Sequence, residues 1–122
     1  MESTYIGQKY ITFLNILKTG NFTKELELLF SPDIKKVVNS KLVCTDRAQL
    51  SKQMGDVVST YGIKNVNLVE LINSDDHKKN VIRFELTYND NSTDSVISIL
   101  TPDEHGLISE INEVAGEKHG HE

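Results

Sequence analysis

Cysteine is nearly absent from this sequence of 122 residues, since Cys44 is the only one. A single cysteine excludes a disulfide within the chain and is typical of proteins in a reducing compartment. The first ten residues also lack the basic start and apolar core of a secretion signal. These absences together predict a cytoplasmic location.

An excess of positive charge is missing as well. The chain has 13 lysines and arginines against 18 acidic residues, which gives a net charge of −5. Without a basic stripe to displace counterions, non-specific binding to nucleic acid is excluded. The adjacent lysines Lys35-Lys36 and Lys78-Lys79 are interpreted as parts of a solvated surface.

Long hydrophobic runs do not occur either. No apolar stretch approaches the roughly 20 residues that a membrane-spanning helix needs, so no membrane partner is expected. The sequence shows no internal repeat and no linker. We predict one domain over residues 1–116, followed by a polar tail at residues 117–122.

Apolar residues at helical spacing predict two amphipathic helices. The first helix stops at Gly20 and carries Ile6, Tyr10, Phe13, Leu14 and Leu17. The other runs from a cap at Thr45 to Gly62 and carries Leu50, Met54, Val57, Val58 and Tyr61. Their shared pattern indicates that both helices pack on one surface.

A shorter helix is predicted between these two. Thr23 is expected to cap it, and it is expected to end at Phe30 because Pro32 cannot continue a helix. Pro32-Asp33 is interpreted as the corner at which the chain turns from the helical layer into a strand.

The chain after Gly62 reads as strands at 66–72, 81–89, 95–100 and 107–114. Residues 81–89 alternate most clearly, with one apolar face formed by Ile82, Phe84, Leu86 and Tyr88. Arg83 and Glu85 lie on the opposite face and are expected to point outward. Helices that precede an antiparallel meander predict an α+β domain with the helices on one face of the sheet.

Four segments in this order resemble the nuclear transport factor 2-like superfamily, which includes ketosteroid isomerases, scytalone dehydratase and SnoaL-type cyclases. They are "KTGNF", "LELLFSPDI", "TDRAQLSKQM", which lacks the family's glycine, and "DEHGLISEINEV". The resemblance covers nearly the whole chain. It implies a cone-shaped fold in which three N-terminal helices pack on a curved, mainly antiparallel sheet. It also implies a cavity at the wide end and, in many members, a dimer formed through the outer sheet face.

The resemblance also allows a check for the catalytic residues of the isomerases, which are a tyrosine, an aspartate base and a protonated aspartate. The tyrosine position falls near Phe13, or on Tyr10 if the first helix shifts by most of a turn. The base position falls at residues 38–39 and the second aspartate position at residues 96–97, all of which lack an acid. Asp94 is the nearest carboxylate and the single weak catalytic candidate.

No metal site or cofactor is expected. His77, His105, His119 and His121 all fall in predicted loops or in the tail. The segment "DNSTD", which starts at Asp90, lacks the glycine and glutamate of a calcium loop.

The sequence therefore leads to three functional hypotheses. The first is a SnoaL-like domain that binds a small apolar molecule in the cone without the isomerase residues. The expected cavity lining is Tyr10, Phe13, Leu17, Met54, Val58, Tyr61, Phe84 and Tyr88. The alternatives are an isomerase, cyclase or dehydratase whose acid or base is not located, and an adaptor that binds a protein through its sheet. A homodimer is expected because residues 66–72 and 95–100 are apolar on both faces.

Overall fold

A computed structural model describes residues 6–74 and 78–116 of the chain. Its helices are α1 (Ile6–Ile16), the short 3₁₀ helix η2 (Leu17–Thr19), α2 (Thr23–Leu29) and α3 (Arg47–Thr60). Its strands are β1 (Phe30–Val38), β2 (Lys41–Cys44), β3 (Ile63–Asn73), β4 (Asn80–Tyr88), β5 (Thr93–Pro102) and β6 (Ile108–Val114).

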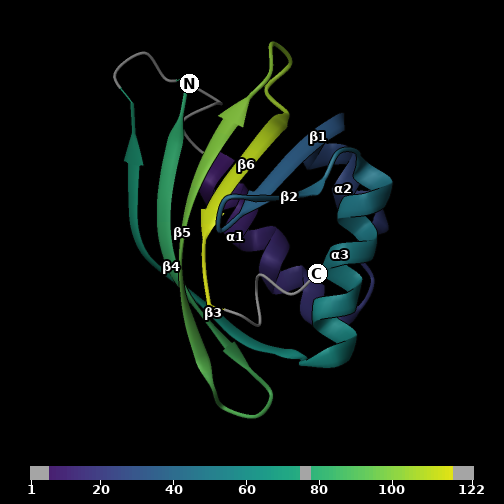
Figure 1. Ribbon diagram of the computed structural model, residues 1–122, viewed down its shortest axis with the longest axis vertical. Coiled ribbons are helices and arrows are strands. Elements are labelled where there is room, and N and C mark those ends of the chain that lie inside the picture. Colours follow the sequence, from purple (N-terminus) through teal and green to yellow (C-terminus); the bar gives the residue numbers. More distant parts are fainter. Residues whose placement is uncertain (1–5, 75–77, 117–122) are drawn as a thin grey trace.

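The strands form a sheet in the order β2-β1-β6-β5-β4-β3. Strands β1 and β6 run parallel, and the other neighbouring pairs run antiparallel. The sheet curves around α1, and the helices cover its inner face (Figure 1). Helix α1 contacts β3, β4 and β5, whereas α3 contacts β1 and β2. The predicted α+β fold with a curved, mainly antiparallel sheet is confirmed.

The core lies between the helices and the inner face of the sheet. Ile82, Phe84, Leu86 and Tyr88 of β4 are buried, whereas Arg83 and Glu85 are exposed, as the alternation predicts. Aromatic rings join the layers, since Phe30 packs edge-on against Tyr10 of α1 at a centroid distance of 6.2 Å. The inner face of the sheet is therefore the surface that any interior site must use.

The helix ends are partly as predicted. Gly20 and Gly62 follow their helices with φ of 74° and 71°, which confirms the expected stops. The predicted cap at Thr45 is wrong, because Asp46 is the N-cap and its carboxylate accepts from the Gln49 backbone N–H at 2.8 Å. The cap at Thr23 is also wrong, since this residue already lies inside α2.

The corner between α2 and β1 lies two residues earlier than predicted. Helix α2 ends at Leu29, and Phe30 is already extended, with φ of −113° and ψ of 144°. Pro32 therefore lies within β1 and not at the turn. The sheet tolerates it because the β1–β6 register is interrupted between Phe30 and Lys35, where no ladder hydrogen bond from Pro32 is needed.

The hairpin formed by β1 and β2 was not predicted from the sequence. Asn39 and Ser40 link these strands with φ of 52° and 69°, the left-handed backbone of a two-residue hairpin turn. Asn-Ser is a weaker turn signal than Asn-Gly, and β2 is only 4 residues long. This hairpin supplies the outer strand against which α3 packs.

Candidate functional site

A group of polar side chains lies buried between the helices and the sheet. Its members come from five different elements, and we name them the interior polar cluster: Tyr10, Lys36, Gln53, Ser98 and Glu113. Lys36 and Glu113 have exposed fractions of 0%, and Gln53 reaches only 7%. Buried charges and amides of this kind need partners, because each loses its hydration on folding.

Glu113 is the centre of this cluster. Its Oε2 atom accepts hydrogen bonds from the Tyr10 hydroxyl at 2.7 Å and the Ser98 hydroxyl at 2.5 Å. Its Oε1 atom lies 3.8 Å from Nζ of Lys36. Strand pairing fixes part of this geometry, because Ser98 and Glu113 are direct partners across β5 and β6.

Lys36 is held on the other side of the cluster by α3. Its Nζ atom donates to Oε1 of Gln53 at 2.8 Å and lies 3.9 Å from Sδ of Met54. The interpretation of Lys35-Lys36 as a solvated pair is thus wrong for Lys36, although Lys35 is exposed. Alternation along β1 turns Lys36 inward and Lys35 outward.

Burial displaces the pKa values of two cluster members. It lowers the pKa of Lys36 from its ordinary value of 10.5, and the negative charge of Glu113 acts in the opposite direction. Burial also raises the pKa of Tyr10 well above 10.0, and the charge and hydrogen bond of Glu113 raise it further. Tyr10 therefore stays a hydroxyl donor, while Lys36 gives up its proton more readily than an exposed lysine.

A surface groove of about 290 Å³ lies between β2 and α3. Its lining residues are Lys41, Leu42, Val43, Gln49, Lys52, Gln53 and Asp56. Gln53 belongs both to this groove and to the interior polar cluster, since its amide oxygen accepts from Lys36. The side chain of Gln53 is therefore the link between the groove and the buried amine.

The residues predicted to line a cavity all contribute to the core. Six are buried, and Val58 and Tyr61 are partly buried against the same core. Phe13 also lines a second groove of about 390 Å³ beside α1 and α2. That these eight residues surround a ligand stays a prediction.

Asp94, the weak catalytic candidate, is partly buried at the start of β5. Its Oδ2 atom accepts a hydrogen bond from the Tyr88 hydroxyl at 2.8 Å. Burial and this hydrogen bond raise the pKa of Tyr88. Asp94 thus holds a core tyrosine in place, and a catalytic role for it stays a prediction.

Tyr10 is the one member of the interior polar cluster that was predicted as a site residue, whereas sequence reasoning missed Lys36, Gln53, Ser98 and Glu113. A signal for Lys36 exists, because it stands two residues from Ile34 and two from Val38, both of which are buried. Glu113 stands two residues after the buried Ile111. In β6, however, the apolar residues Ile108, Ile111 and Val114 recur every third position, which hides the strand alternation.

The described residues contain neither a metal-binding cluster nor a membrane-spanning helix. Within residues 6–74 and 78–116, no group of three or more histidine, cysteine or acidic residues could hold a metal ion. His105 is exposed, and His77, His119 and His121 lie outside the described residues. Among the described helices, none has the length and apolar character that crossing a membrane requires.

No protein-family model and no curated protein sequence matches this chain. Solved structures do match it. An NTF2-like protein of unknown function from Exiguobacterium sp. 255-15 has 18% identity and a TM-score of 0.73, covering 92% of this chain and 98% of that one.

Enzymes occur among the similar structures. A steroid delta-isomerase from Pseudomonas aeruginosa has 13% identity and a TM-score of 0.71, and the match covers 98% of this chain and 90% of the isomerase chain. The epoxide hydrolase/cyclase-like enzyme SalBIII, which acts in pyran ring formation in the polyether salinomycin, has 13% identity and a TM-score of 0.74, covering 95% of each chain. The chain therefore has the nuclear transport factor 2-like fold that the SnoaL-like and steroid isomerase structures share.

Proposed function

We propose that the chain is a small-molecule enzyme of the isomerase or cyclase kind, in which Glu113 transfers a proton inside the cone. The observation that carries this proposal is the fully buried Glu113 carboxylate, which holds two hydroxyl groups and faces an amine. Groups with displaced pKa values gather at functional sites because acid–base catalysis requires them. The isomerase and the cyclase-like enzyme with this fold support the reaction class.

The energetics of the interior polar cluster support a chemical role. Taking a carboxylate and an ammonium out of water costs several kcal/mol for each ion. Apolar side chains of similar volume in such places are often equally stabilising or more so. Stability alone therefore does not explain why a lysine and a glutamate, and not two apolar residues, occupy these fully buried positions.

The proposed reaction assigns a task to each group. Glu113 takes a proton from a carbon beside a carbonyl and returns it to another atom of the same molecule. The Tyr10 hydroxyl and an N–H group of Lys36 donate to the carbonyl oxygen and stabilise the negative charge that develops on it. Tyr10 is one of the two residues at which the family resemblance places the isomerase tyrosine, whereas the acid comes from β6 and not from residues 38–39 or 96–97.

Proton exchange in deuterated water tests this proposal without knowledge of the natural substrate. The wild-type protein should accelerate loss of the α-proton signals of a panel of cyclic and acyclic ketones, followed by NMR. Glu113→Gln keeps the shape of the side chain but cannot accept the proton, so the rate should fall about 100-fold.

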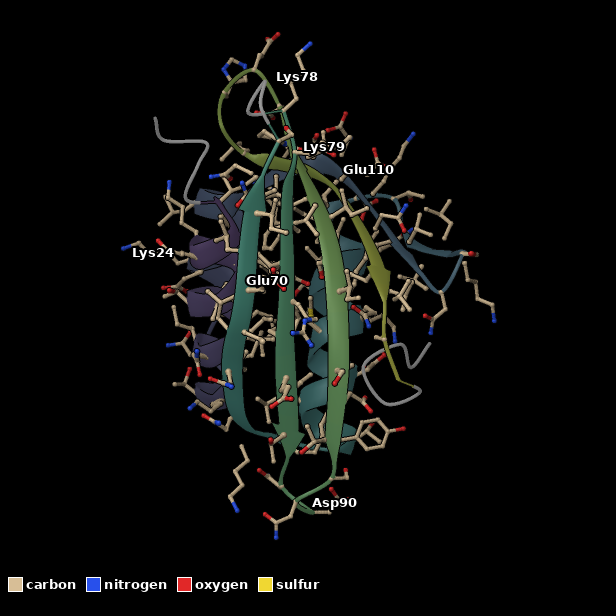
Figure 2. The ribbon with its side chains drawn as sticks, turned by 90° about the vertical axis from the view of Figure 1, so that its left-hand side faces the viewer. Lys24, Glu70, Lys78, Lys79, Asp90 and Glu110 are labelled. Atoms are coloured by element: carbon tan, nitrogen blue, oxygen red, sulfur yellow. The ribbon has the colours of Figure 1, made fainter. Side chains whose placement is uncertain are left out.

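Two matched variants complete this experiment. Glu110→Gln changes an exposed carboxylate of the same strand, labelled in Figure 2, and should leave the rate unchanged. Asp94→Asn should also leave the exchange rate unchanged. If the exchange rate were lost in this variant, Asp94 would be the catalytic acid. A wild-type protein that exchanges no ketone faster than buffer would contradict the proposal.

Binding of a small apolar molecule without catalysis is the second candidate. It is favoured by the apolar and aromatic character of the eight core residues predicted to line a cavity. Fluorescence of the apolar probe N-phenyl-1-naphthylamine measures such binding directly. Binding that persists in Glu113→Gln, combined with no ketone exchange in the wild type, would favour this candidate.

We further propose that a second copy of the chain covers the outer face of the sheet. Apolar side chains are exposed there, with exposed fractions of 53% for Ile72, 46% for Ile97 and 63% for Val114. Ile97 and Val114 are direct partners across β5 and β6, so they form one continuous patch. Figure 2 views this outer face, with Glu70 near its middle. A partner protein instead of a second copy would make the chain an adaptor.

A further inference from the structure

We infer that Lys36 forms an imine with a small aldehyde or ketone that reaches it through the groove between β2 and α3. The inference rests on the proposed function in that it uses the same interior polar cluster. It goes further because it assigns a covalent step and a class of ligand.

The position of Lys36 suits a nucleophile. Its Nζ atom is fixed between Oε1 of Gln53 at 2.8 Å and Oε1 of Glu113 at 3.8 Å. Gln53 lines the groove of about 290 Å³ and also accepts the hydrogen bond from the amine, so its amide connects the two. The proposed imine requires the Gln53 side chain to rotate, because Lys36 has an exposed fraction of 0% in this structure.

The surroundings of Lys36 favour the neutral amine that such a step needs. An ammonium cannot attack a carbonyl carbon, and desolvation is a recognised way of activating a lysine. Burial lowers the pKa of Lys36, which increases the share of neutral amine at a given pH. Glu113, beside it, accepts the proton that the amine releases.

The step balances without an oxidant or reductant. The nitrogen lone pair of Lys36 attacks the carbonyl carbon, the carbonyl π electrons move to oxygen, and Glu113 passes a proton to that oxygen. Glu113 then takes a proton from the nitrogen, which gives the neutral carbinolamine, and passes this proton to the hydroxyl group, so that the C–O bond breaks and water leaves. It finally takes the last proton from the nitrogen and leaves a neutral imine. Amine and carbonyl compound thus give imine and water, with Glu113 as the proton carrier.

The groove also indicates which carbonyl compounds fit. Lys41 and Lys52 lie on its lining, and Lys52 is paired with Asp56 at 3.2 Å. Asp56 also lines the groove, so two lysines face one carboxylate, and the net positive charge that remains favours a carbonyl compound that carries a carboxylate. A small 2-oxo acid combines this charge with a reactive ketone, and pyruvate is the simplest probe.

Reductive trapping tests the inference on the full chain. The wild-type protein is incubated with pyruvate and sodium cyanoborohydride, and fragment mass spectra assign the adduct to Lys35 or Lys36. Lys35 is the matched control because it is the exposed neighbour on the same strand. We expect Lys36 to be modified about tenfold faster than Lys35, since an activated amine outcompetes an exposed ammonium.

A purely structural Lys36 would give the opposite result. With 0% exposure it would be modified more slowly than Lys35, and this outcome would overturn the inference. Lys36→Arg keeps a positive charge but cannot form the imine, so the wild-type adduct should disappear while adducts at exposed lysines remain.

The two proposals can fail separately. An unmodified Lys36 in a protein that still exchanges ketone protons through Glu113 would overturn the imine and leave the proposed function standing. An adduct at Lys36 with no exchange would support the imine and contradict proton transfer to carbon. In Glu113→Gln, adduct formation at Lys36 should slow several-fold without moving to another lysine.

Discussion

Ser98 and Glu113 face each other across β5 and β6, and the Ser98 hydroxyl donates to Oε2 of Glu113 at 2.5 Å. This pairing places the carboxylate on the inner face of the sheet, where the Tyr10 hydroxyl donates to the same oxygen. A polar pair of this kind on a buried sheet face is the structural basis of the candidate site.

Removing Lys36 alone should destabilise the fold strongly. Lys36→Met leaves Glu113 buried opposite a thioether, and breaking such a pair costs about 3–5 kcal/mol of unfolding free energy. Urea denaturation measures this loss. The double variant Lys36→Met, Glu113→Leu should recover most of it, because no unpaired charge then remains. Lys35→Met, on the exposed face, should change the free energy by less than about 0.5 kcal/mol.

Truncating Phe30 tests the packing at the start of β1. Its ring has 0% exposure and packs against Phe13 at a centroid distance of 5.0 Å. Phe30→Ala should therefore lower the free energy of unfolding by about 3–5 kcal/mol, the range for a buried aromatic side chain. A loss below about 1 kcal/mol in urea melts would show that α2 and β1 do not pack around this ring.

Alkaline pH should weaken the fold through Tyr10. Its pKa is raised in the folded protein above the ordinary 10.0, so above pH 10 the unfolded chain releases a proton that the folded chain keeps. The unfolded state then binds fewer protons, and the stability from this group falls as pH rises.

The Tyr10→Phe variant isolates this contribution. The difference in unfolding free energy between the wild type and the variant should be constant below pH 9 and shrink above about pH 10. Lys36 acts with the opposite sign, because its lowered pKa makes stability rise with pH up to its ordinary value of 10.5. A wild-type to variant difference that does not change between pH 9 and 11 would contradict the raised pKa of Tyr10.

One substitution that introduces a charge on the outer face of the sheet tests dimerisation. Light scattering at micromolar concentration should report twice the chain mass of 13.7 kDa for the wild type. Ile97→Glu places a carboxylate in the exposed apolar patch and should give a monomer with unchanged circular dichroism. Leu28→Glu, on the exposed side of α2, is the control and should stay dimeric. A monomeric wild type would contradict the proposed second copy.

The sequence by itself determined most of the local structure. Helical spacing identified α1 and α3, the glycines after them marked their ends, and alternation identified the buried face of β4. These features depend on neighbours within a few residues, so they can be read along the chain. The cap at Thr45 was wrong because the adjacent Asp46 takes that role. The cap at Thr23 was wrong because α2 begins after Phe22, whose side chain makes no cap hydrogen bond, and the corner at Pro32 was wrong because the chain is already extended at Phe30.

Only the tertiary structure decided the candidate site. Lys36 and Glu113 are separated by most of the chain, and they meet because β1 lies parallel to β6 in the sheet. Nothing local fixes that strand order, which follows from how the whole sheet buries its inner face against the helices. When each position of the sequence is considered separately, a charged residue is expected on the surface. Lys36 and Glu113 become partners only when β1 pairs with β6. The same pairing buries both charges, so each then compensates part of the desolvation cost of the other.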